Sequence, residues 1–298
     1  MHPKSKKSFQ RKIVPYLFLL PLFVLLGIFK FYPSASAIVR SFFDWNGGAQ
    51  STFVGFANYV RMFQDEIFGK SLVNLLIISI ASILKVITIP LLIAELVVRI
   101  KSKRLSDAYK YIFIIPMVIP TMVITLLWQW IYDYNGLLNG LLNALGLSGL
   151  ANTSWLGSER TALGSIIGFN FPWIAGIQFL IFLSGLQNIP SSLYEAADLE
   201  GVTWFQRLFR IDIPLLAGQF RYLIITTLTT SFQAFEYVLV LTNGGPGTST
   251  MVPALYLYQE SFSYFRMGYA CALGTALFVI ILLLTAAGMK FIGGSENE

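Results

Sequence analysis

Six apolar runs dominate the pattern of hydrophobic and polar positions along the chain. A helical span of a bilayer needs about 17–25 predominantly apolar residues, and each run is of this length. The runs lie near residues 13–32, 72–95, 111–132, 162–183, 219–241 and 268–289. The pattern therefore predicts an all-α membrane protein, in which six transmembrane helices form a single transmembrane domain over residues 1–298.

The basic residues between the runs predict the orientation of the chain in the membrane. Fourteen of the 21 lysines and arginines flank the runs on one side, and five lie on the other. Because basic loops stay in the cytoplasm, both termini are expected there, as an even number of spans also requires. Ala35-Ser36-Ala37 resembles a signal-peptide cleavage site, but the uncharged stretch from Ile13 to Phe29 is long for a signal peptide. We therefore expect the first span to be retained.

The composition excludes several other classes of protein. Hydrophobic residues make up 55% of the chain and charged residues 12%, whereas intrinsic disorder needs low hydrophobicity and high charge. A single cysteine, Cys271, excludes a disulfide framework, and one cysteine with one histidine argues against structural zinc. The net charge is +6, but the basic residues flank the apolar runs instead of forming one basic face. This distribution argues against nucleic acid as a partner.

The sequence carries no motif for ATP hydrolysis or for the commoner hydrolytic reactions. A phosphate-binding loop needs Gly-x4-Gly-Lys-Ser/Thr. Gly69-Lys70-Ser71 matches the end of this motif, but Gln64 stands where its first glycine belongs. His-Glu-x-x-His and Gly-x-Ser-x-Gly are also absent. We therefore expect a protein that is not an enzyme, binds no cofactor or metal itself, and relies on a partner for any use of ATP.

The cytoplasmic stretch 184–218 is polar enough to form a small structure of its own. A helix is expected to begin at Ser191 or Ser192, either of which can cap it, and Gly201 can end it with a positive φ angle. A second short helix is expected over residues 204–210, which would complete a helix–turn–helix. The physical pattern alone favours an ordinary re-entrant or amphipathic connector over a docking structure.

Within this stretch, Glu195-Ala196-Ala197 is followed by Gly201 and by Ile211-Asp212-Ile213-Pro214. The spacing resembles the EAA motif of ABC-importer permeases, EAA-x3-G-x9-I-x-L-P, with isoleucine in place of leucine at Ile213. In that family the loop forms a coupling helix that docks in a groove of the ATPase subunit. The resemblance implies a docking surface made of Glu195, Ala196, Ala197, Asp198 and Gly201.

A second motif, Leu241-Thr242-Asn243-Gly244-Gly245-Pro246-Gly247, resembles the signature of MalF-like sugar permeases. Further family positions are similar to Phe53-Val54-Gly55, Asn58-Tyr59, Trp128-x-Trp130, Gly136-Leu137-Leu138-Asn139, Trp155-Leu156-Gly157 and Gly268-Tyr269-Ala270. The likeness covers residues 13–289. The chain lacks the extra N-terminal spans and large outer domain of the maltose permease, which argues against maltose as the substrate.

The resemblance implies a complete transport system. It implies the type I ABC importer permease fold in a prokaryotic inner membrane, with this chain as half of the translocation pathway. The implied partners are a second homologous permease, two ATPase subunits that bind ATP and Mg, and an extracytoplasmic solute-binding protein. The implied substrate is a carbohydrate, by preference an oligosaccharide. We expect the second permease to be a different chain.

Polar residues within the spans are candidates for the substrate pathway, because they are costly in a membrane and often functional. Thr229, Gln233, Glu236 and Tyr237 would share one face of a continuous helix. The candidates are Asn170, Trp173 and Gln178 in the fourth span, and Phe232, Gln233, Glu236 and Tyr237 in the fifth. They could instead form hydrogen bonds between helices. Glu236 could also pair with Lys85, the other clear intramembrane charge.

Two other classes of membrane protein are considered. An ion- or proton-coupled secondary transporter would need intramembrane acids and internal repeats, and the sequence offers only Glu236 as a clear acid and no convincing repeat. A membrane enzyme or scaffold would need a catalytic set, and none is present in the sequence.

Overall fold

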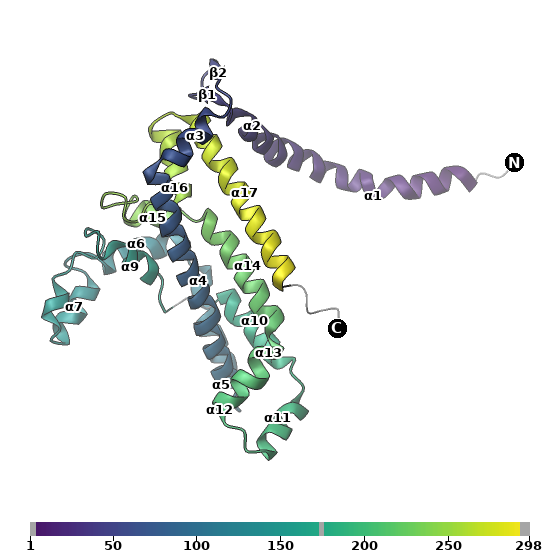
Figure 1. Cartoon of the computed structure of the whole chain (residues 1–298). Coiled ribbons are helices and arrows are strands. Elements are labelled where there is room, and N and C mark those ends of the chain that lie inside the picture. Colours follow the sequence, from purple (N-terminus) through teal and green to yellow (C-terminus); the bar gives the residue numbers. More distant parts are fainter. Residues whose placement is uncertain (1–3, 173–175, 293–298) are drawn as a thin grey trace. The chain divides into compact units, whose positions relative to one another are not determined.

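The structure is a computed structural model that describes residues 4–172 and 176–292. In this part of the chain the regular structure is helical apart from one two-stranded sheet (Figure 1). The chain divides into two compact units. The first unit comprises residues 1–64 and 257–278, and the second comprises residues 65–256 and 279–298.

The first unit begins with a long apolar helix and continues into a two-stranded sheet and a short helix. Its elements are α1 (Lys4–Leu26), a π-helical segment (Gly27–Phe31), α2 (Tyr32–Arg40), β1 (Phe43–Trp45), β2 (Ser51–Phe53), α3 (Ala57–Gln64), a second π-helical segment (Gln259–Ser263) and the first part of α17 (Met267–Ile292). Strands β1 and β2 are antiparallel, with Phe43 opposite Phe53. Asn58 holds this turn, since its side-chain amide donates to the carbonyl oxygens of Ser41 at 2.9 Å and Phe43 at 3.0 Å.

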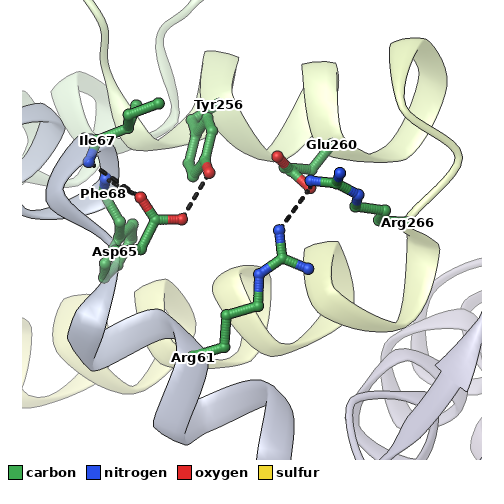
Figure 2. Close-up of polar contacts among 7 residues, drawn as sticks. All are labelled: Arg61, Asp65, Ile67, Phe68, Tyr256, Glu260 and Arg266. Carbon is green, nitrogen blue, oxygen red and sulfur yellow. Dashed lines mark hydrogen bonds and ion pairs between the residues drawn. The ribbon is translucent and has the colours of Figure 1, made fainter.

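A buried carboxylate joins the remaining elements of the first unit. Figure 2 shows Arg61 and Arg266 reaching Glu260, with nitrogen–oxygen distances of 3.8 and 3.5 Å to the same oxygen. Glu260 is 2% exposed, so its charge needs this compensation. The Arg61 guanidinium also lies 4.1 Å from the centre of the Tyr269 ring, a cation–π distance.

Replacing Gly268 by alanine should destabilise the first unit. A Cβ at this position would overlap the carbonyl oxygen of Phe43, which is backbone and cannot move alone. Overpacking of this kind costs about 1–3 kcal/mol, and thermal unfolding of the detergent-purified protein should show a lower Tm. Gly69→Ala is the matched control, because its Cβ would meet open space on a helix. Equal Tm values for the two variants would contradict the close approach at Gly268.

The second unit contains most of the helices and begins with the long helix α4. Its elements are α4 (Glu66–Val98), α5 (Lys103–Ile114), a 3-10 turn (Ile115–Val118), α6 (Thr121–Ile131), α7 (Leu137–Ala144), α8 (Ser148–Ala151), α9 (Ala162–Gly168), α10 (Gly176–Gln187), α11 (Ser191–Leu199), α12 (Trp204–Arg207), a π-helical segment (Leu208–Asp212), α13 (Ile213–Leu215), α14 (Ala217–Gln233) and α15 (Glu236–Leu241). Helix α16 (Pro253–Tyr258) crosses the division between the units, as does α17.

Helix α4 is the central support of the second unit, with α10 and α14 packed along it (Figure 1). Asp65 caps its start, since the carboxylate accepts from the backbone amides of Ile67 and Phe68 (Figure 2). The other carboxylate oxygen accepts from the Tyr256 hydroxyl at 2.6 Å. The core includes Leu91, Ala94, Val97, Phe179, Phe182, Leu183, Leu186, Leu208, Leu216 and Leu223. The end of α4 near Val98 is therefore tied to α10, the π-helical segment and α14.

The six predicted spans correspond only in part to single helices. Among the described residues, three helices are long and apolar enough to cross a membrane: Val14–Arg40, Glu66–Val98 and Met267–Lys290. Two bent pairs raise the number to five: Lys103–Val118 with Thr121–Ile131, bent by 93°, and Trp204–Leu215 with Ala217–Gln233, bent by 70°.

The predicted spans over 111–132, 162–183 and 219–241 are not continuous helices. The first is broken where Pro116 and Pro120 remove backbone donors. In the second, α9 ends at Gly168, and Asn170 adopts a positive φ of 60° two residues before Pro172. The third breaks between α14 and α15, where Ala234 is extended. No proline or glycine marks this last break.

Candidate functional site

Residues 191–215, which we call the coupling pad, form a chain of short helices at the end of the core. Its first helix, α11, starts at Ser191 with Pro190 as the N-cap residue and without a side-chain cap, so the predicted serine cap is wrong. Proline is suited to this place because it cannot supply a donor. The predicted stop at Gly201 is confirmed: its φ is 66°, and the amide of Val202 donates back to the carbonyl of Ala197 at 3.0 Å.

The second half of the coupling pad extends further than predicted. Thr203 and Gln206 form a reciprocal capping box at the start of α12, which the sequence analysis missed although Thr-x-x-Gln is its signature. The helix then continues through the π-helical segment into α13. Pro214 therefore lies inside a helical turn and does not close a loop.

The EAA residues divide between the surface and the interior of the pad. Glu195, Ala196, Asp198 and Gly201 are exposed. Ala197 is only 6% exposed, because it follows Tyr194 by three residues and shares its inward face. The surface also carries large apolar side chains that sequence analysis missed: Leu193, Leu199, Phe205 and Phe209. Leu199 is 90% exposed.

A buried polar cluster holds the two halves of the pad together. The Tyr194 hydroxyl donates to Oδ1 of Asp212 at 2.9 Å, and Nε of Arg207 lies 3.7 Å from Oδ2 of the same carboxylate. The Arg207 guanidinium lies 3.6 Å from the centre of the Tyr194 ring, a cation–π distance. Burial and the hydrogen bond to Asp212 raise the pKa of Tyr194 to about 12. The hydroxyl therefore remains a donor at any physiological pH.

The same cluster reaches the end of α4. The carboxyl group of Glu95 lies next to that of Asp212, and the two residues are 1% and 0% exposed. Arg99 lies 3.5 Å from Glu95 and 5.7 Å from the centre of the Trp204 ring on α12. Two adjacent buried carboxyl groups need compensating cations, which Arg99 and Arg207 supply. The cluster thus connects the coupling pad to α4, one of the helices that are long and apolar enough to cross a membrane.

Of the six pathway candidates that the structure describes, three line one cavity of about 260 Å³ in the second unit. These are Asn170, Gln178 and Tyr237. The Tyr237 ring stacks on Phe169 with centroids 5.2 Å apart and an interplanar angle of 2°. Phe169 also lines the cavity and was missed, because nothing in an apolar run distinguishes one phenylalanine from another.

Three other candidates do not line this cavity. Phe232 is buried in the helix packing, whereas Gln233 and Glu236 are exposed. The predicted polar stripe on one helix face is wrong, because α14 ends at Gln233 and α15 begins at Glu236. Trp173 lies outside the described residues.

Lys85 extends from α4 into the same cavity. Its ammonium group donates to the carbonyl oxygens of Ile167 at 2.7 Å and Phe169 at 3.4 Å. The pairing with Glu236 considered from sequence is not formed. Within residues 4–172 and 176–292, Lys85 is in no ion pair.

The signature loop after α15 lines a second cavity, of about 630 Å³. Asn74 of α4 holds this loop by donating to the carbonyl oxygens of Thr248 at 3.3 Å and Met251 at 3.0 Å. Other positions that are similar to family positions also stabilise the fold. Trp155 donates to the side-chain oxygen of Asn139 at 2.7 Å, which joins two of the motifs directly. Trp155 and Asn139 therefore have a structural role that accounts for their place in these motifs.

Comparison with known proteins identifies the class. Residues 86–292 match the family described as "Binding-protein-dependent transport system inner membrane component". The chain is 35% identical to the probable ABC transporter permease protein YurN of Bacillus subtilis, over 97% of this chain and 99% of the relative. It is 32% identical to the sulfoquinovosyl glycerol transport system permease protein SmoG of Agrobacterium fabrum, over 94% and 91% of the two chains.

A solved structure supports the fold. It is the crystal structure of a bacterial ABC transporter involved in the import of the acidic polysaccharide alginate. The match has a TM-score of 0.84 and 24% identity, and it covers 99% of this chain and 100% of that chain. The fold is thus that of a membrane subunit of an ABC transporter. The chain belongs to the family of binding-protein-dependent transport system inner membrane components, which the relatives named as ABC transporter permeases also indicate.

Proposed function

We propose that this chain is one of two permease subunits in an ATP-driven, binding-protein-dependent importer for a carbohydrate. It would lie in a prokaryotic inner membrane with six spans and both termini in the cytoplasm. The observation that carries the proposal is the coupling pad, whose outer surface carries exposed apolar side chains and whose inner face is joined to α4 by buried charges. The relatives named as ABC transporter permeases support it.

The coupling pad is the proposed contact with the ATPase subunit. Exposed apolar side chains on an otherwise polar surface favour a protein partner. Closure of two ATP-binding partner subunits would push the pad, and the Tyr194–Asp212 contact would pass the displacement to α4 through Glu95. ATP and Mg would be bound by those partners. A second, homologous permease would complete the pathway, and an extracytoplasmic binding protein would deliver the substrate.

Gly201→Asp tests the docking assignment. The positive φ of Gly201 suits glycine, but asparagine and aspartate tolerate it best among other residues. Aspartate adds a charge to the proposed interface, so co-purification of the ATPase subunit and ATP-driven uptake should both fall by about tenfold or more. Gly201→Asn is the matched control and should retain both. Unchanged assembly and uptake in Gly201→Asp would contradict docking at this surface.

The alternative function is that of a secondary transporter. The source of energy for uptake distinguishes it from the proposed importer. The proposed importer should lose uptake when cellular ATP is depleted and retain it when ion gradients are collapsed. The reverse result would favour an ion- or proton-coupled transporter.

A further inference from the structure

Among the described residues that line the 260 Å³ cavity, Lys85 alone carries a charged side chain. The other lining residues are neutral, and they include Ser82, Asn170, Gln178, Thr227, Thr230 and Ser231. An ammonium group has three donors, and backbone carbonyls of Ile167 and Phe169 accept from it. At least one donor therefore remains for a ligand.

The carbonyl groups stabilise the ammonium group without neutralising it. They belong to the last turn and the C-cap of α9, where carbonyl dipoles favour a cation. A charge in a membrane-spanning segment is nevertheless costly, and such residues usually pair or serve the transported ligand. Since no described carboxylate pairs with Lys85, its net positive charge is left to act on whatever occupies the cavity.

We propose that Lys85 recognises an anionic group on the substrate, and that the substrate class is an acidic carbohydrate bearing a carboxylate, sulfonate or phosphate. The inference rests on the proposed function as a carbohydrate importer. The amides of Asn170 and Gln178 can bond sugar hydroxyls, and the stacked rings of Phe169 and Tyr237 offer an apolar face for sugar C–H groups. The cavity thus combines the three kinds of contact that an acidic sugar needs.

A matched set of probes tests the substrate class in the whole transporter, reconstituted with its own partner subunits and binding protein. Digalacturonate is compared with neutral digalactose, and sulfoquinovose and glucose 6-phosphate are compared with glucose. ATP-driven uptake of at least one acidic probe should exceed that of its neutral counterpart by tenfold or more. The acidic group that is accepted distinguishes carboxylate, sulfonate and phosphate.

Variants at Lys85 then test whether this residue recognises the acidic group. Lys85→Met should lower uptake of the accepted acidic probe by tenfold or more, and Lys85→Arg should retain it within about threefold. Co-purification of the ATPase subunit with each variant controls for assembly.

Three results would overturn the proposal in distinguishable ways. Equal uptake of acidic and neutral probes would exclude the substrate class and leave the importer function intact. Equal loss of acidic and neutral uptake in Lys85→Met, with a lower Tm, would show that Lys85 serves only to hold α9. No ATP-driven uptake of any probe would overturn the carbohydrate importer function itself.

Discussion

Asp212→Ala should lower ATP-driven uptake by tenfold or more, the largest loss that we expect from one buried residue. Asp212 is 0% exposed and binds both Tyr194 of α11 and Arg207 of α12. The alanine leaves a cavity where the carboxylate was. The Arg207 guanidinium, whose side chain is only 16% exposed, then loses this partner for its charge. Breaking a buried ion pair on one side costs about 3–5 kcal/mol. The two halves of the coupling pad should then move independently.

The effect is measured as uptake and ATP hydrolysis in the same proteoliposomes, because a failure of coupling lowers the first more than the second. Tyr194→Phe removes only the hydroxyl donor at a cost of about 1 kcal/mol, so a several-fold loss of uptake is expected. Arg210→Ala is the control, since Arg210 is exposed on the same π-helical segment. Asp212→Ala with uptake within twofold of the parent would refute a mechanical role for the cluster.

Leu199→Glu should abolish stable association with the ATPase subunit. Leu199 is 90% exposed at the end of α11, beside a surface that also carries Leu193, Phe205 and Phe209. Losing an apolar anchor at an interface costs about 2–4 kcal/mol, which corresponds to a 30- to 1000-fold weaker complex at about 1.4 kcal/mol per tenfold. A buried glutamate would add to this loss. Because the side chain has little contact within the chain, the Tm of the isolated subunit should not change.

Binding is measured by titrating the purified ATPase subunit onto the detergent-purified permease. Leu145→Glu is the matched control, since Leu145 is 74% exposed after α7 and lies outside the coupling pad. It should bind the ATPase subunit as the parent does. Similar binding by both variants would place the interface elsewhere on the chain.

The sequence predicted those features that depend on local pattern. The apolar runs gave the helical membrane class, and the EAA spacing located the coupling pad and its stop at Gly201. Helix breaks were predictable only in part. Pro116 and Pro120 are visible as breakers, whereas the break after Gln233 has no local signal and depends on tertiary packing.

The candidate site was harder to predict because its contacts join distant segments. Asp212 lies inside the recognised motif, yet its neighbour Glu95 is on another helix, and only the folded chain brings them together. Phe169 is another example, since its role depends on stacking with Tyr237. The inward direction of the Ala197 side chain was also not predicted, because the motif resemblance alone implied that this residue belongs to the docking surface.

Helix α4 carries both Lys85 and Glu95, so a single rod joins the cavity to the coupling pad. Ten residues at 1.5 Å each separate them by roughly 15 Å along the axis. Pro90 lies between them inside the helix, and its missing N–H leaves the carbonyl of Val86 without the usual donor. The helix can bend most easily at this midpoint, so a small displacement at Glu95 would change the tilt of the helix segment that carries Lys85.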